Sequence, residues 1–301
     1  LNKSTGLDHA RHKCWDKAIP LLEKSLAADP EDGETRMRLA EAYAAESQYE
    51  GACRHLEEIL DRNPTSAAAA RALGAIYARQ QEYDRAIEYL EKAVKLDPDH
   101  AQTCYRLGMA YDNKKRYEEA IESFKKAIRL DSEYVEAYNT LGHVFFEEGR
   151  LESAEYYFTY SISLSKSMRR KSIALSSPMS YAESQAEAFN GLGEICISRG
   201  SLYRALDYFG TANSFAHDWE TPWFNKGRTY EALGNIKAAE IAYQRSIDLA
   251  PGNTWAYKNL ARMYRRSGRE SEAMTLYRRA MRVDSTDAEC YYGLAELYRD
   301  K

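Results

Sequence analysis

The sequence has no run of 18 apolar residues, which a membrane-spanning helix would need. Its start, Leu1-Asn2-Lys3-Ser4, lacks the apolar stretch of a signal peptide. Acidic and basic side chains nearly balance, with 46 Asp and Glu against 42 Lys and Arg, so the net charge gives no general attraction to nucleic acid or membrane. We therefore expect no membrane insertion and no nucleic-acid partner.

Cysteine is also scarce, and its few positions are scattered. The five residues are Cys14, Cys53, Cys104, Cys196 and Cys290. An odd number at irregular spacing argues against a disulfide framework. This pattern favours a reducing compartment, so we expect a cytoplasmic protein and leave a periplasmic location open. Because the chain begins with Leu rather than Met, we also expect a fragment or a processed product.

Catalytic motifs are missing as well. The sequence has no P-loop, no zincin motif and no nucleophile elbow. Gly191-Leu192-Gly193 belongs to the repeat described below, and His9, His12 and Cys14 come nearest to a metal-ligand set. Since no carboxylates are paired in a way that suggests acid–base chemistry, we expect no enzyme, no cofactor and no bound metal.

What the chain does have is a period of 34 residues. Alanines recur at this spacing from Ala18 to Ala154, and again from Ala205 to Ala273 after one step of 51 residues. The full set is Ala18, Ala52, Ala86, Ala120, Ala154, Ala205, Ala239 and Ala273. A period of this length predicts a stacked repeat array rather than a single closed core.

Offsets from each marker alanine predict two helices per repeat. Four residues later a large side chain follows: Leu22, Leu56, Leu90, Phe124, Phe158, Phe209, Tyr243 and Tyr277. Twelve residues earlier the residue is small: Gly6, Ala40, Gly74, Gly108, Gly142, Gly193, Gly227 and Ala261. A glycine inside a helix costs about 1 kcal/mol relative to alanine, so we expect two helices to cross where a side chain would not fit. Prolines at Pro30, Pro64, Pro98 and Pro251 mark the end of the second helix.

This pattern resembles the tetratricopeptide repeat, and it covers the whole chain except residues 165–185. The resemblance implies an all-α, right-handed α-solenoid, or superhelix, of about eight helix-turn-helix repeats. We place the N-terminal repeats at 1–164 and the C-terminal repeats at 186–301. The units are 1–32, 33–66, 67–100, 101–134, 135–164, 186–219, 220–253 and 254–287, and residues 288–301 form a terminal helix.

Residues 165–185 form a serine-rich insertion with the basic run Arg169-Arg170-Lys171. One interpretation is a longer turn with extended flanking helices. The other is a regulatory or binding loop. Ser172 follows the basic run and Ser177 precedes Pro178, so both resemble kinase sites and are candidate phosphorylation sites.

In the tetratricopeptide family the first helix of each repeat lines a concave groove. Residues at the same offsets in two C-terminal repeats of this chain are therefore expected to face such a groove. Asn225 and Asn259 are equivalent residues one repeat apart, as are Arg228 and Arg262. The resemblance implies that such asparagines bind a peptide backbone. The expected peptide-binding residues are Phe224, Asn225, Arg228, Trp255, Lys258, Asn259, Arg262 and Arg265. Residues 254–287 carry eight Lys and Arg against four Asp and Glu, which favours an acidic ligand, although a solvated basic face remains an alternative.

Three hypotheses for function follow. The first is a protein–protein interaction scaffold that binds an extended peptide or a partner helix in its groove. The second is the recognition arm of a larger enzyme or signalling protein, and the third is a self-assembling repeat module. No three successive repeats carry the full carboxylate-clamp order of chaperone-tail cochaperones, so we do not expect that ligand.

Overall fold

The computed structural model describes residues 2–171 and 180–299 of the chain. Within these residues it has 17 helices and no strand. The chain divides into two compact units, Leu1–Ala137 and Tyr138–Lys301, which are described in turn. The division falls inside helix α9 (Val135–Glu147).

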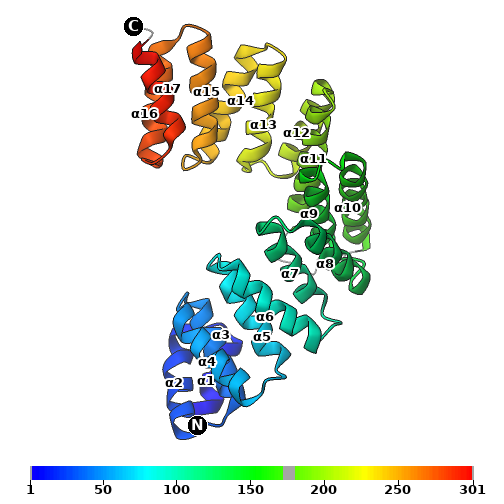
Figure 1. Ribbon diagram of the computed structural model, residues 1–301, viewed down its shortest axis with the longest axis vertical. Helices are drawn as coiled ribbons and strands as arrows, with labels where there is room; N and C mark the ends of the chain where they lie inside the picture. The colour runs from blue at the N-terminus through cyan, green and yellow to red at the C-terminus, as the bar shows by residue number, and fades with distance from the viewer. Residues whose placement is uncertain (1, 172–179, 300–301) are drawn as a thin grey trace. The chain divides into compact units, whose positions relative to one another are not determined.

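The first unit consists of four antiparallel helix pairs and the first residues of α9, coloured from blue to cyan-green in Figure 1. Each first helix after α1 has 13 residues and each second helix has 14. The helices are α1 (Asn2–Arg11), α2 (Trp15–Ala28), α3 (Gly33–Ala45), α4 (Tyr49–Arg62), α5 (Ala67–Arg79), α6 (Tyr83–Leu96), α7 (Ala101–Asn113) and α8 (Tyr117–Leu130).

The second unit continues the same pairing and ends on a single helix. Two of its helices are longer than the others: α10 has 21 residues and α11 has 18, because both extend into the serine-rich insertion. After α9 the helices are α10 (Leu151–Lys171), α11 (Tyr181–Ser198), α12 (Leu202–Phe215), α13 (Glu220–Ala232), α14 (Ile236–Leu249), α15 (Thr254–Arg266), α16 (Glu270–Val283) and α17 (Ala288–Arg299). The exact repeat boundaries remain a prediction.

The marker alanines form the centre of each helix pair. All eight are 0% exposed, and the large side chain four residues later is at most 4% exposed in every pair. Burial of one such Leu or Phe side chain contributes about 1.5–3 kcal/mol. The offsets i and i+4 therefore identify the core positions of the second helices.

The small residues of the first helices pack directly on these large side chains. A Cβ atom added to Gly108 would lie 2.7 Å from Phe124, and one added to Gly193 would lie 2.4 Å from Phe209. Gly74, Gly142 and Gly227 approach the large residue of their own pair in the same way. The prediction that helices cross where a side chain would not fit is confirmed.

The turns inside the helix pairs use one left-handed residue each. In the second unit this residue is glycine, with φ of 73° at Gly149, Gly200, Gly234 and Gly268. In the first unit the equivalent residues are Lys13, Ser47, Gln81 and Lys115, with φ between 56° and 62°. Side chains with a Cβ are strained in this conformation, so the same turn costs more in the first unit.

Proline positions also agree with the helix ends. Helices α2, α4, α6 and α14 each end two residues before Pro30, Pro64, Pro98 and Pro251, respectively. The residue before a proline disfavours helical backbone angles, which accounts for this constant gap.

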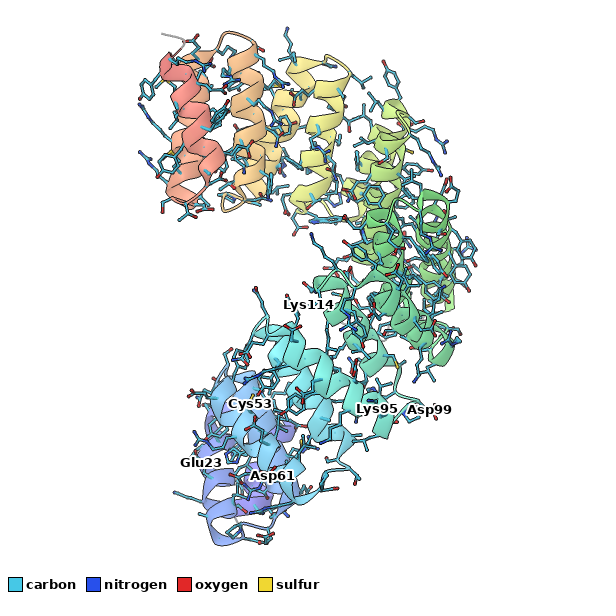
Figure 2. All side chains as sticks on the ribbon, viewed as in Figure 1. Glu23, Cys53, Asp61, Lys95, Asp99 and Lys114 are labelled. Carbon is cyan, nitrogen blue, oxygen red and sulfur yellow. The ribbon has the colours of Figure 1, made fainter. Side chains whose placement is uncertain are left out.

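Neighbouring pairs in the first unit are joined by a repeated side-chain hydrogen bond. The hydroxyl of Tyr43 on α3 donates to Glu23 on α2, which is labelled in Figure 2. Tyr77 donates to Glu57, and Tyr111 donates to Glu91, with the same separation of 20 residues. Each tyrosine follows the small residue of its first helix by three positions. The rings of Tyr77 and Tyr111 are buried and that of Tyr43 is partly buried, while each hydroxyl reaches the previous pair.

Candidate functional site

A cavity of about 300 Å³ lies between the first helices α13 and α15 of the second unit. Its lining consists of Arg228, Glu231, Ala232, Asn259, Arg262 and Arg266. We call it the arginine cavity. Three cations against one carboxylate give it a positive surface that suits an anionic ligand.

The 34-residue period places the two main arginines together. Arg228 and Arg262 each follow the small residue of their helix by one position, and α13 and α15 belong to successive pairs. Equivalent positions on stacked helices lie side by side. The sequence therefore predicts the meeting of these two residues, and the structure brings both into one cavity.

An asparagine supports each arginine from three residues earlier. Nη1 of Arg228 donates to Oδ1 of Asn225 at 3.4 Å, and Nη2 of Arg262 donates to Oδ1 of Asn259. The amide nitrogen of Asn259 donates to the backbone oxygen of Trp255 at 2.8 Å, which fixes the asparagine on its own helix. The repeated Asn-x-x-Arg pattern therefore orients two guanidinium groups.

Charge compensation in the arginine cavity is incomplete. Glu231 accepts from Arg266 at 3.2 Å and from the hydroxyl of Tyr243 at 3.0 Å. Arg262 lies 3.6 Å from Glu289. Arg228 forms no salt bridge within residues 2–171 and 180–299, and Arg262 Nε is buried without a hydrogen-bond partner among them. Both arginines thus keep capacity for an added carboxylate.

Asn225 is buried and belongs to a network between α11 and α13. Its amide nitrogen donates to Oδ1 of Asn190 at 3.1 Å, and Asn190 donates to Glu194 at 3.3 Å. Burial raises the pKa of Glu194, against the opposing effects of the Arg228 charge and a hydrogen bond from Asn225. Asn225 is therefore engaged inside the chain rather than pointing a free amide at a ligand.

Two of the expected cations are neutralised by carboxylates on α17 or directly before it. Lys258 is 6% exposed and lies 2.9 Å from Asp287 and 3.0 Å from Glu289. Burial lowers its pKa, but the hydrogen bonds to these two carboxylates outweigh that effect and raise the pKa overall. Arg265 pairs with Glu296 of α17 in the same manner. Both side chains thus join α15 to the last described helix, α17, and the residue before it.

The two aromatic residues of the expected set differ in exposure. Phe224 packs against the core next to Tyr243, with ring centroids 6.0 Å apart, and the Arg228 guanidinium lies 5.8 Å from its ring. Trp255 is 58% exposed, and Lys258 Nζ lies 4.1 Å from its ring. Neither residue lines the arginine cavity.

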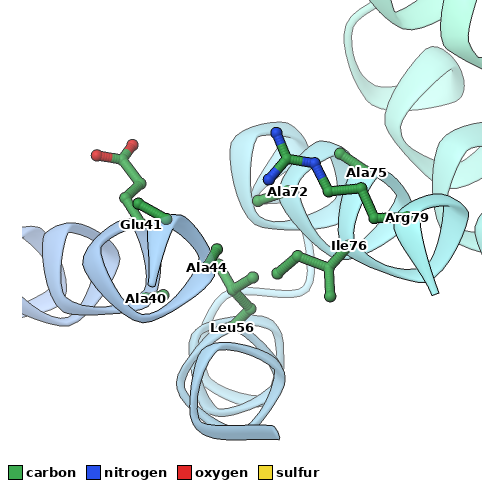
Figure 3. A pocket seen from close by; sticks show the side chains of 9 residues that line it. Ala40, Glu41, Ala44, Leu56, Ala72, Ala75, Ile76 and Arg79 are labelled. Atoms are coloured by element: carbon green, nitrogen blue, oxygen red, sulfur yellow. The ribbon is translucent and has the colours of Figure 1, made fainter. Parts of the chain in front are cut away.

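A second cavity, of about 250 Å³, was missed at the level of sequence. It lies between α3 and α5 in the first unit, and Figure 3 shows Leu56 and Ile76 between the two helices with Glu41 and Arg79 above them. Small residues create the space: Ala40, Ala44, Ala45, Ala72 and Ala75. The signal in the sequence was this concentration of alanine on two successive first helices.

Ser172 and Ser177, the candidate phosphorylation sites, lie outside the described residues. Within the described ranges, no group of three or more His, Cys, Asp and Glu side chains is placed to hold a metal ion. The helices described are also too short or too polar to cross a membrane.

Family models match most of the chain. Tetratricopeptide repeat models match residues 13–76 and 220–286, and a TPR repeat model matches residues 113–149. A model of anaphase-promoting complex, cyclosome, subunit 3 matches residues 46–127. The chain is a tetratricopeptide repeat protein, and the predicted all-α solenoid is confirmed.

Two curated relatives share part of this array. Protein CTR9 homolog of Arabidopsis thaliana is 24% identical over 146 residues, which are 47% of this chain and 13% of the relative. Protein O-mannosyl-transferase TMTC3 of Homo sapiens is 29% identical over 136 residues, which are 40% of this chain and 15% of the relative. The chain thus matches a small part of two longer proteins.

Solved structures agree on the fold. Yeast Tom70 has a TM-score of 0.65 at 20% identity, over 95% of this chain and 58% of that one. Cut9, from the APC/C hetero-tetramer Cut9-Hcn1, has a TM-score of 0.63 at 18% identity, over 94% and 52%. At these identities the likeness extends to the fold alone. The repeat families support a protein-interaction scaffold.

Proposed function

We propose that this scaffold binds an acidic segment of a partner protein in the arginine cavity. The observation that carries the proposal is the meeting of Arg228, Arg262 and Arg266 in one cavity with a single carboxylate, Glu231. Since Glu231 is already shared by Arg266 and Tyr243, the cavity keeps an excess of positive charge. An aspartate or glutamate side chain supplies the missing negative charge.

The arrangement of donors suits a carboxylate. A guanidinium group offers parallel N–H donors that match the two oxygens of a carboxylate. Asn225 and Asn259 already hold Arg228 and Arg262 in place, so less conformational entropy is lost on binding. The asparagines therefore serve the ligand indirectly, by orienting the arginines.

Charge reversal at the two arginines tests the proposal. The probe is a fluorescein-labelled peptide of alternating Glu and Asp, compared with its Gln and Asn counterpart by fluorescence anisotropy. The test variant is Arg228→Glu/Arg262→Glu. The matched control is Lys237→Glu/Arg245→Glu, which makes the same charge change at two exposed residues of α14.

We expect the unaltered chain and the control to bind the acidic peptide at least about tenfold more tightly than its neutral counterpart. The test variant should lose this preference while keeping its helical circular dichroism. If the control lost the same preference for the acidic peptide, net charge rather than the arginine cavity would account for the effect. Unchanged binding by the test variant would place the acidic ligand elsewhere.

A second proposal is that the array is the recognition part of a larger protein. It is supported by the match to 15% of TMTC3 and 13% of the CTR9 homolog. Reading the gene on both sides of residues 1 and 301 tests it. A fused catalytic or signalling domain would support this proposal, and stop codons at both sides would contradict it.

The third proposal, self-association, is supported by the exposed face of α17. Tyr291, Tyr292 and Tyr298 are 51%, 64% and 56% exposed, respectively. Exposed apolar surface of this kind often marks a protein contact. Molar mass measured over a concentration series should rise if α17 mediates assembly, and a constant monomer mass would contradict it.

The cytoplasmic location stays a prediction.

A further inference from the structure

A separate cavity of about 440 Å³ lies where the extended helix α10 meets α11 and α12. Its lining is Lys166, Arg169, Arg170, Gln185 and Phe215. We call it the α10–α12 cavity. Four of these five residues belong to the parts of α10 and α11 that exceed the ordinary repeat length. The cavity is therefore specific to the insertion and does not belong to the repeating groove.

The extension of α10 has a buried side that fixes it in place. Ser165 and Met168 are 0% and 1% exposed, and α10 packs against α11. The hydroxyl of Ser165 lies 3.4 Å from that of Ser184, which also accepts from Asn139 at 3.3 Å. These contacts orient the opposite side of α10, which carries the cations, toward solvent.

The three cations of the cavity have no acidic partner in the part of the chain that the structure describes. Lys166, Arg169 and Arg170 are exposed and form no salt bridge with residues 2–171 or 180–299. The nearby acids of α11 are engaged elsewhere: Glu183 accepts from the backbone nitrogen of Ser180 at 2.6 Å, and Glu187 accepts from Asn139 at 3.2 Å. The described residues thus leave the positive charge of the cavity uncompensated.

Gln185 supplies an independent sign of a ligand. Its side chain is only 2% exposed, yet it lines the cavity and forms no hydrogen bond with the described part of the chain. Its amide oxygen and nitrogen are therefore available to a polar ligand in the cavity. On the same side, Phe215 stacks on Phe189 with centroids 5.8 Å apart, and Lys166 Nζ lies 6.0 Å from the Phe189 ring.

We propose that the α10–α12 cavity binds a phosphorylated side chain of a partner protein. A phosphate monoester carries a charge of about −1.5 to −2 at pH 7 and three acceptor oxygens. Two guanidinium groups, one ammonium and one amide exceed what a single carboxylate can accept, but they suit a phosphate group. The neighbouring aromatic ring of Phe215 provides an apolar wall for the backbone next to it.

The test uses the full chain and a defined probe. The probe is a fluorescein-labelled peptide in which one phosphoserine is flanked by glycine and alanine, compared with its unphosphorylated twin. The test variants are Arg169→Gln/Arg170→Gln and Gln185→Leu. The matched control is Lys17→Gln/Lys24→Gln, which removes two exposed cations of α2 that form no salt bridge with described residues.

We expect the phosphopeptide to bind at least about tenfold more tightly than its twin, and added salt to weaken it. The arginine variant should abolish this preference, Gln185→Leu should reduce it, and the control should keep it. Inorganic phosphate should compete with the peptide. No binding at about 1 mM protein, or equal binding by the arginine variant, would overturn the proposal. Adenosine monophosphate competing better than inorganic phosphate would also overturn it, because it would assign the cavity to a nucleotide.

Discussion

The side-chain amide of Asn225 donates to Oδ1 of Asn190 at 3.1 Å, which joins the first helices of two successive pairs through a buried bond. Asn225 is 2% exposed and Asn190 is 3% exposed. Because both residues are buried, this bond links the stacking of α11 and α13 to the orientation of Arg228, which donates to the same Asn225. Asn225 therefore both joins α13 to α11 and orients an arginine of the arginine cavity.

Replacing Asn225 with alanine should destabilise the α11–α13 stack by about 1–3 kcal/mol, because Oδ1 of Asn190 loses its buried donor. Hydrogen exchange of the α11 and α13 amides measures this locally. The double variant with Asn190→Ala should cost less than the sum of the two single variants. Strict additivity would show that the two amides do not interact.

Gly227→Ala should destabilise the second unit by about 1–3 kcal/mol, as overpacked cores do. The added Cβ would lie 2.5 Å from Cδ1 of Tyr243, whose side chain is fully buried. Gly210→Ala is the matched control, since nothing lies within 4 Å of a Cβ at that helical position. Urea unfolding should show the control unchanged or stabilised by up to about 1 kcal/mol. Similar losses in both variants would contradict the crossing argument.

Gln81→Gly should stabilise the first unit by about 1 kcal/mol, because Gln81 has a φ of 62° in the turn between α5 and α6. The reverse change, Gly234→Ala, places a Cβ at a φ of 73° and should destabilise the second unit by a similar amount. Thermal unfolding measures both. A loss of stability in Gln81→Gly would show that its side chain contributes more than the strain costs.

His143 predicts a pH dependence of stability. Burial lowers its pKa to about 4, so the folded chain holds the neutral ring. Its contribution is fully present above the unfolded pKa of about 6.5 and is lost as the pH falls toward 4, by up to about 3 kcal/mol. Unfolding measured between pH 7 and pH 4 should show a shallower loss in His143→Gln. Equal slopes would place the titration on another group.

Much of the fold was predictable because small and large side chains recur at fixed offsets within the 34-residue period. The marker alanines, the large residues four positions later and the prolines all lie where their offsets place them. The left-handed turn residues of the first unit were not predictable, since Gln81 and Ser47 carry no glycine signal. Their conformation is imposed by the helices on either side.

The site was predictable only in part, for a physical reason. Equivalent offsets place Arg228 and Arg262 in one cavity, because the period fixes which side chains are neighbours. The partners of Lys258 and Arg265 come from α17 and from Asp287 directly before it, beyond the last full pair. Offsets within one repeat do not show that a cation is neutralised by a carboxylate outside that repeat. They also gave no sign of the α10–α12 cavity, which extended helices create.

The most direct measurement is an NMR titration of the arginine Nε–Hε signals, assigned by single Arg→Lys variants, with the acidic peptide. The signals of Arg228, Arg262 and Arg266 should shift together with one dissociation constant, and those of the exposed Arg278 and Arg282 on α16 should stay in place. Shifts confined to other arginines, or equal shifts across all of them, would contradict an acidic-peptide site in the arginine cavity.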